Sequence, residues 1–95
     1  MEWYMYIVKC ADGSLYTGIT KDLKRRVREH NFDNRLGAKS LRRKRPVSLA
    51  YYEAFENQIE AARRERSIKH WTREYKLKLI EGFTLKNSDF LGPVA

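Results

Sequence analysis

The pattern of apolar positions predicts three strands. Residues 3–10 are aromatic or β-branched on both alternating faces, which is typical of a central strand covered on both sides. A turn signal at 11–13 separates this segment from residues 15–19, which we expect to return as a second strand. Residues 47–55 have the composition of a third strand. Residues 31–46, directly before this strand, are expected to form a long loop.

Helical spacing and capping residues predict three helices. The first begins at Thr20 or Asp22 and runs to about His30, and the second follows the Asn57 capping signal to about Trp71. A third helix over 72–80 is closed by a glycine at 82. The order β-β-α-β-α-α predicts an α+β domain in which a small three-stranded antiparallel β-sheet is flanked by helices. We expect one domain over 1–82 and a C-terminal tail over 83–95.

The turn between the first two strands decides which of their side chains share a face. A two-residue turn would put Tyr6 and Tyr16 on opposite faces of the sheet. A three-residue loop over 11–13, with Gly13 in the left-handed region, instead pairs Tyr6 with Gly18 and turns both tyrosines the same way. We predict the three-residue loop, because glycine stands where it requires one. A glycine at position 18 in a strand also lets a ligand or another group approach closely.

Composition narrows the class of partner. The 95 residues carry 20 Lys and Arg against 12 Asp and Glu, a formal net charge of +8. This balance argues against an acidic, calcium-buffering surface and favours a polyanionic partner such as nucleic acid. The single cysteine, Cys10, excludes an internal disulfide and a multi-cysteine zinc site. With no apolar run long enough for a signal peptide or membrane span, we expect a cytoplasmic protein without a membrane partner.

The positive charge is concentrated in one segment. No acidic residue stands between Asp33 and Glu53, which indicates either a nucleic-acid-binding patch that follows phosphates or a solvated loop. The stretch at 37–39 lacks the sequence of a phosphate-binding loop. The candidate nucleic-acid-binding residues in the segment are Arg35, Lys39, Arg42, Arg43, Lys44 and Arg45.

Two helices carry charged residues on faces that should be buried. Glu65 falls between Ala61 and Ala62 on the helical wheel, where a carboxylate requires a cation, either a metal ion or Lys69 one turn later. On the first helix, Arg26 and His30 flank the apolar stripe at a spacing of one turn. They could contact a phosphate and a reacting water, or simply cover the core with an arginine stem and a hydrogen-bonded histidine.

Together these residues resemble the GIY-YIG nuclease superfamily, particularly its small stand-alone members. The resemblance rests on Tyr4-Met5-Tyr6, Tyr16-Thr17-Gly18 and Arg26, and covers about residues 3–71. It implies the α+β fold above and a metal-dependent cut of a phosphodiester bond in nucleic acid, with DNA favoured over RNA. It implies the catalytic residues Tyr6, Tyr16, Arg26, His30 and Glu65, with Gly18 as a structural motif residue and Glu65 as the metal ligand.

The chain also departs from the family pattern. Tyr4 and Met5 stand where the first motif has Gly and Ile, and Thr17 replaces Ile in the second. Ile19 stands where the excision-repair nucleases have Lys, and the later Asn of some members is matched only loosely by Asn87. Because larger members use an attached DNA-binding domain to select targets, the resemblance leaves room for a targeting protein partner.

The implied cofactor is one divalent cation, Mg²⁺ or Mn²⁺, held by Glu65 with water and a phosphate oxygen as further ligands. Arg26 would contact the same phosphate, and Tyr6 would position the reacting groups by hydrogen bonding. Either Tyr16 or His30 would accept the proton of the attacking water. A nucleic-acid-binding module of the same fold with weak or lost activity is the alternative. A protein-interaction domain using residues 71–80 is a third possibility, and the sequence leaves the oligomeric state open.

Overall fold

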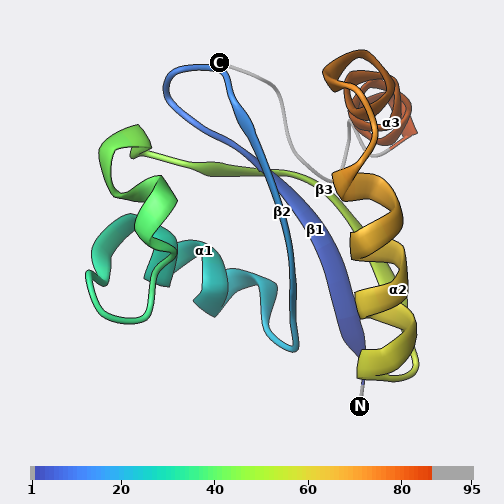
Figure 1. Ribbon diagram of the computed structural model, residues 1–95, viewed down its shortest axis with the longest axis horizontal. Coiled ribbons are helices and arrows are strands. Elements are labelled where there is room, and N and C mark those ends of the chain that lie inside the picture. The colour runs from blue at the N-terminus through green and yellow to red at the C-terminus, as the bar shows by residue number, and fades with distance from the viewer. Residues whose placement is uncertain (1, 87–95) are drawn as a thin grey trace.

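The computed structural model describes residues 2–86, and its elements follow the predicted order (Figure 1). A short 3₁₀ helix interrupts the segment that we expected to be a loop, because Leu41 turns inward there and is buried. The elements are β1 (Trp3–Lys9), β2 (Leu15–Thr20), α1 (Leu23–Phe32), η1 (Lys39–Lys44), β3 (Ser48–Phe55), α2 (Gln58–Lys69) and α3 (Arg73–Lys86).

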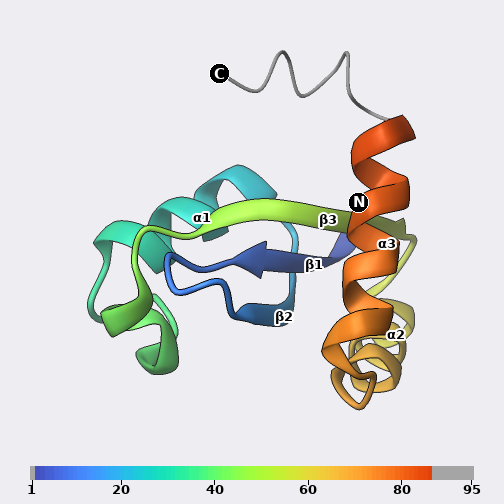
Figure 2. The same cartoon turned by 90° about the horizontal axis from the view of Figure 1, so that it is seen from above.

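The sheet is three-stranded and antiparallel, as predicted, with β1 in the centre of the order β2-β1-β3. Helix α1 lies on one side of the sheet, whereas α2 and α3 lie together at the other (Figure 2). Each face of β1 therefore belongs to its own core. Tyr6 and Val8 pack with Leu41 and Val47, while Met5 and Ile7 pack with Ile68 of α2.

The β1–β2 hairpin has the predicted three-residue loop. The amide of Cys10 donates to the carbonyl of Ser14 at 2.8 Å, and Gly13 has a φ of +85°. This left-handed conformation is open to glycine at little cost, so Gly13 closes the loop. Tyr6 consequently pairs with Gly18.

The first two helices begin where their capping residues predict. Of the two candidates for the first N-cap, Asp22 is the one used, since its carboxylate accepts the amide N–H of Arg25 at 3.0 Å. Asn57 caps α2 in the same way by accepting the amide N–H of Glu60 at 2.9 Å. These side-chain acceptors satisfy amides that have no partner within the helix.

The third helix ends later than we predicted. It continues through Gly82 to Lys86, so the first residues assigned to the tail belong to α3. Gly82 is exposed and helical rather than a stop signal, and Phe83 beyond it packs against Tyr51 and Tyr52 of β3 at 5.3 Å between ring centroids. This aromatic contact explains why the helix extends. The rest of the predicted tail, with Asn87, lies outside the described residues.

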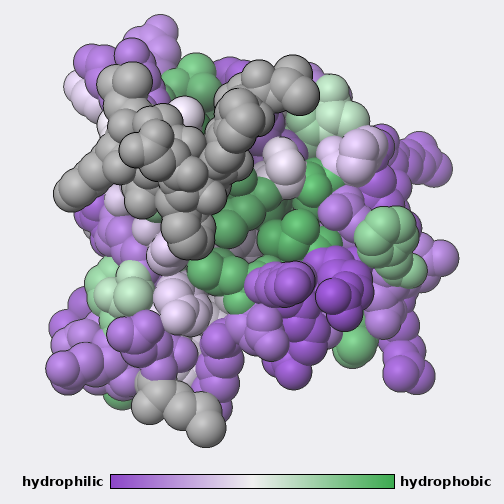
Figure 3. Space-filling view, turned by 180° about the vertical axis from the view of Figure 1, so that it is seen from behind, coloured by the Kyte–Doolittle hydropathy of each residue, from purple (hydrophilic) through white to green (hydrophobic). Residues whose placement is uncertain are grey.

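The face opposite to the viewer of Figure 1 has apolar side chains at its centre, surrounded by hydrophilic ones (Figure 3). An open groove of about 620 Å³ lies between α1 and the sheet, lined mainly by Tyr4, Leu23, Val27, Leu49 and Tyr52. Over residues 2–86, no helix has both the length and the apolar character needed to cross a membrane.

Candidate functional site

His30 joins the two motif tyrosines. It is completely buried on α1, and its Nε2 lies 2.7 Å from the Tyr6 hydroxyl, which is itself 1% exposed. The Tyr16 ring meets the His30 ring edge-on, with 5.4 Å between their centroids. The register of the hairpin and the inward face of α1 thus bring three of the five predicted catalytic residues into one cluster.

Gly18 makes room for this cluster. It pairs with Tyr6 across the sheet, and a Cβ built on it would lie 2.6 Å from the Tyr6 hydroxyl oxygen and 2.8 Å from Cζ. Any larger residue would push the Tyr6 ring out of its position, and the buried ring has little room to move. The close approach predicted for this strand glycine is therefore made by a side chain of the site itself.

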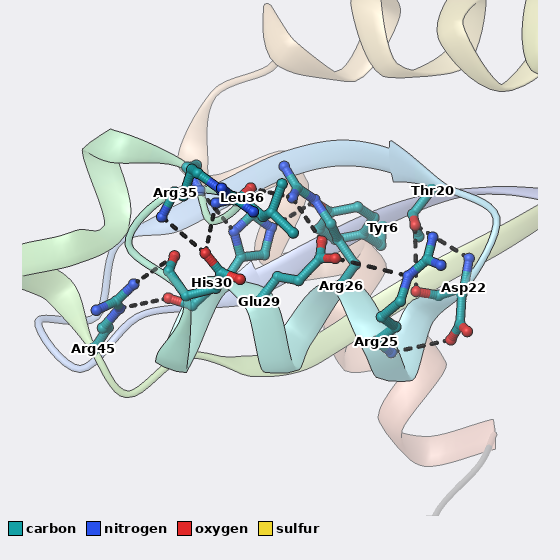
Figure 4. Close-up of polar contacts among 12 residues, drawn as sticks. Tyr6, Thr20, Asp22, Arg25, Arg26, Glu29, His30, Arg35, Leu36 and Arg45 are labelled. Carbon is teal, nitrogen blue, oxygen red and sulfur yellow. Dashed lines mark hydrogen bonds and ion pairs between the residues drawn. The ribbon is translucent and has the colours of Figure 1, made fainter.

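Arg26 lies one turn before His30 and is held by two acceptors (Figure 4). Its Nη1 donates to Glu29 Oε1 at 3.0 Å and to the carbonyl of Leu36 at 2.6 Å. The Arg26 side chain is 26% exposed and that of Glu29 is 19% exposed, so the guanidinium can still be reached from solvent. Both contacts use the same nitrogen and fix the direction of the guanidinium.

The buried pair at the centre of the site is electrically neutral at pH 7. Burial raises the pKa of Tyr6 to about 12, with Tyr16 and Glu65 adding to the rise and Arg26 opposing it. Burial also lowers the pKa of His30 to about 4, and the positive charges of Arg26 and Arg45 contribute. Tyr6 is therefore a protonated phenol and His30 a neutral imidazole under physiological conditions.

Glu65 lies on α2, which packs on the other side of the sheet from α1 (Figure 2). It lies on the packed face of α2, between the buried Ala61 and Ile68, and its side chain is only 18% exposed. Lys69 Nζ lies 3.1 Å from Glu65 Oε1, so the ion pair that we considered is formed. The negative charge of Glu65 also contributes to the raised pKa of Tyr6, so the carboxylate is within electrostatic range of the cluster.

The donor set around Glu65 fits a cation with few protein ligands. A carboxylate oxygen is the donor that Mg²⁺ and Mn²⁺ prefer, and here it already attracts a positive group, the Lys69 ammonium. Among residues 2–86, no three His, Cys, Asp or Glu side chains are grouped to hold a metal ion. A divalent cation at Glu65 would thus compete with Lys69 and take its remaining ligands from water or substrate.

The six basic residues of the predicted patch divide into two groups. Arg45 donates to the carbonyls of His30 and Asp33 and to the side chain of Asn34, at 2.6, 3.2 and 2.9 Å. Arg42 donates to the carbonyl of Asn34, and Lys44 lies 4.0 Å from a carboxylate oxygen of Asp12. These three side chains contact other segments of the chain, whereas no such polar contact is made by the side chains of Arg35, Lys39 and Arg43 within the described residues. Arg42 is itself exposed, as are Arg35, Lys39 and Arg43.

Sequence reasoning missed four contributors to the site. Glu29 could have been found from its i, i+3 spacing to Arg26, which allows an ion pair on a helix. The Asp33 carboxylate accepts two backbone amides in an Asx turn, a structure that Asp and Asn favour. No sequence signal shows that the carbonyl of Leu36 and the amide of Ala38 would reach Arg26 and His30.

Known sequences resemble this chain over most of its length. Residues 2–78 match the family model described as the GIY-YIG catalytic domain. A UPF0213 protein of Staphylococcus saprophyticus is 53% identical over 77 residues, which cover 81% of this chain and 92% of that protein. A UPF0213 protein of Clostridium perfringens is 48% identical over 87 residues, covering 92% of this chain and 91% of that protein. Neither name states an activity.

Two solution NMR structures share the fold. A UPF0213 protein from Bacillus halodurans superposes with a TM-score of 0.53 at 41% identity, covering 85% of this chain and 84% of that one. A protein from E. faecalis superposes with a TM-score of 0.60 at 35% identity, covering 90% of this chain and 88% of that one. The helix-flanked three-stranded sheet is thus common to this chain and its relatives.

Proposed function

This chain belongs to the family of the GIY-YIG catalytic domain, and from that membership we propose that it is a metal-dependent endonuclease that hydrolyses phosphodiester bonds in DNA. The observation that carries the proposal is the cluster of Tyr6, Tyr16 and His30, with Arg26 beside it and Glu65 within electrostatic range. A hydroxyl-rich site next to a guanidinium and a carboxylate suits a phosphodiester, whose reaction needs positive charge and an activated water.

Arg26 and a metal ion held by Glu65 would both act on the negative charge of the scissile phosphate. The Arg26 guanidinium, oriented by Glu29 and Leu36, would bind a non-bridging oxygen of the scissile phosphate. Members of the family typically use a divalent metal, and in this chain Glu65 would hold it. When bound, such a cation neutralises charge on the phosphate and on the leaving oxygen.

Tyr6 and Tyr16 would have different roles, one in orienting a ligand and the other in accepting a proton. Tyr6 stays protonated, since its pKa is about 12, and so orients a water or a phosphate oxygen by hydrogen bonding rather than by taking a proton. Tyr16, half-buried and in contact with the His30 ring, is the residue that we assign to receive the proton of the attacking water, a step that requires Tyr16 to enter it as the phenolate. The exposed Arg35, Lys39 and Arg43 would bind the flanking phosphates.

The test compares three variants of α2 in cleavage of labelled single-stranded, duplex and branched DNA, and of RNA, with Mg²⁺ or Mn²⁺. Glu65→Gln should lower the cleavage rate at least about 100-fold, because the ligand carboxylate is lost. Lys69→Ala breaks the same ion pair but keeps the carboxylate, and should retain activity. Glu60→Gln removes an exposed carboxylate from the same helix and controls for charge.

The outcomes distinguish a nuclease from a nucleic-acid-binding module. Cleavage by wild type and Lys69→Ala but not by Glu65→Gln supports the nuclease and its metal ligand. Equal cleavage by Glu65→Gln contradicts the assignment of Glu65. Salt-dependent binding without cleavage of any of the four substrates would instead support a nucleic-acid-binding module of the same fold.

A further inference from the structure

The segment Asp33–Ala38, which we term the 33–38 loop, contacts two residues of the site through its backbone. The carbonyl of Leu36 accepts Arg26 Nη1 at 2.6 Å (Figure 4). The amide N–H of Ala38 donates to His30 Nδ1 at 3.3 Å. Both contacts are made by main-chain atoms, so their direction depends on the path of the loop and not on its side chains. The loop is therefore a structural part of the site without supplying a side chain to it.

The Ala38 contact determines which nitrogen of His30 carries the proton. A backbone N–H can only donate, so His30 Nδ1 must present its lone pair. A neutral imidazole has one N–H, which must then be on Nε2. Nε2 lies 2.7 Å from the Tyr6 hydroxyl oxygen. It follows that the protonated Nε2 donates to this oxygen. The complete burial of His30 keeps the ring neutral, in agreement with its lowered pKa.

This tautomer has a consequence for Tyr6. Because the Tyr6 oxygen accepts the proton of His30 Nε2, the proton of the Tyr6 hydroxyl points away from His30 and is free to be donated to another group. With the Nδ1–H tautomer the direction would reverse, and the Tyr6 proton would be used on His30. The loop amide thus decides whether the Tyr6 proton points to His30 or away from it.

We propose that the 33–38 loop is a positioning element that holds His30 as the Nε2–H tautomer, turns the Tyr6 hydroxyl proton toward the substrate and aims the Arg26 guanidinium. His30 is in this assignment a positioning residue and not the base that accepts the proton of the attacking water. The catalytic part of the inference rests on the proposed nuclease function, whereas the tautomer does not.

The loop is built to keep its shape. Asp33 Oδ1 accepts the amides of Arg35 and Leu36, both at 2.8 Å, and the carbonyl of Asp33 accepts the amide of Gly37 at 3.0 Å. The Arg45 guanidinium donates further hydrogen bonds to the carbonyl of Asp33 and to Asn34 Oδ1. A Cβ on Gly37 would lie 2.4 Å from the carbonyl oxygen of Glu29 and 2.6 Å from that of Asp33. Since backbone atoms cannot give way as a flexible side chain does, only glycine fits at this position.

The first experiment measures the tautomer directly. Long-range ¹H–¹⁵N correlation spectra of the ¹⁵N-labelled full chain at pH 7 distinguish a protonated ring nitrogen from one with a free lone pair. We expect His30 to show protonated Nε2 and unprotonated Nδ1, with the exposed His70 as a second imidazole in the same spectrum. An Nδ1–H tautomer or an imidazolium at His30 would overturn the proposal. This result holds whether or not the protein cleaves nucleic acid.

The second experiment moves the loop. Gly37→Ala forces the loop away from α1, whereas Gly82→Ala, where a Cβ meets nothing within 4 Å, is the matched control. We expect Gly37→Ala to change the ring ¹⁵N signals of His30 and to lower kcat about 10- to 100-fold at nearly constant KM, since a displacement of about 1 Å at a site has this effect. Gly82→Ala should leave both measurements unchanged.

A folded Gly37→Ala protein with wild-type His30 signals would overturn the positioning role. If this variant does not fold, Asp33→Ala takes its place, because it removes the Asx acceptor from amides that water can reach. It should shift the His30 signals in the same direction, and unshifted signals would contradict the proposal. If wild type cleaves no substrate, the proposed function fails while the spectra still decide the tautomer.

Discussion

At the scale of single residues, Tyr4 and Tyr6 provide a matched pair on one face of β1. The Tyr6 hydroxyl is buried against His30, whereas the Tyr4 hydroxyl donates to the exposed Glu2 at 3.1 Å. Tyr6→Phe leaves the ring in the core but removes the acceptor of a buried N–H, which costs about 1–3 kcal/mol. We expect urea unfolding to show this loss and cleavage to fall at least about 100-fold.

The control for this prediction is Tyr4→Phe. It removes an exposed hydroxyl from the same strand face, so both its stability and its cleavage rate should match wild type. Equal cleavage by Tyr6→Phe would mean that the hydroxyl has no part in the reaction.

His30 also makes stability depend on pH. Its pKa is about 4 in the folded protein, against 6.5 for an unperturbed histidine. Between these values the unfolded chain binds a proton at this residue and the native state does not, so stability decreases as the pH falls. We expect a loss of up to about 1.4 kcal/mol per pH unit from pH 6.5 downward, measured by urea unfolding at pH 7, 6 and 5.

A variant without the imidazole tests the source of this pH dependence. His30→Gln should flatten the change of unfolding free energy between pH 7 and pH 5. Asp12 and Asp33 have lowered pKa values, so they stabilise the fold above about pH 4 and lose this effect only below it. An unchanged slope in His30→Gln would assign the effect to another group.

At the scale of elements, Arg45 and Asn31 both join α1 to the segment that leads from η1 into β3. Arg45 satisfies the carbonyls of His30 and Asp33 at the end of α1 and thereby joins this helix to the segment before β3. Arg45→Ala should destabilise the protein by about 1–3 kcal/mol, because it leaves partly buried acceptors unpaired. The exposed Arg43→Ala should change the urea midpoint little while weakening the binding of nucleic acid.

This pair of variants distinguishes a structural arginine from a binding one. If Arg45→Ala weakens binding but not folding, Arg45 belongs to the nucleic-acid surface, as its place in the basic segment indicates. If Arg43→Ala destabilises the fold, the division of the basic segment into two groups is wrong.

At the scale of the whole molecule, the sequence predicted what depends on periodicity and on special residues. The apolar residues on both faces of 3–10 identified β1 as the central strand, and the position of Gly13 predicted the register that turns Tyr6 and Tyr16 to one face. The helical wheel alone placed Glu65 on the packed side of its helix, where its side chain is indeed mostly buried. These features follow from local rules, because each depends on residues close together in the chain.

The features that the sequence did not predict depend on contacts between distant segments. Arg45 resembles its basic neighbours in the sequence, and only its acceptors on α1 distinguish it from them. The end of α3 depends on the packing of Phe83 against β3 and not on Gly82. The Ala38 amide acts through the path of the 33–38 loop, which alanine itself does not encode. In each case tertiary contacts outweigh the local signal.

The distribution of charge over the molecule gives a last prediction, since a net charge of +8 alone attracts any polyanion. The triple variant Arg35→Gln, Lys39→Gln and Arg43→Gln removes exposed charges beside the site. A second triple, at the exposed Arg63, Arg66 and Arg73 of α2 and α3, removes the same charge elsewhere. In salt titrations of DNA binding, the slope of log K against log salt should fall by about 1 per lost phosphate contact in the first variant only. Equal slopes in both triples would mean that total charge, and not this surface, binds the phosphates.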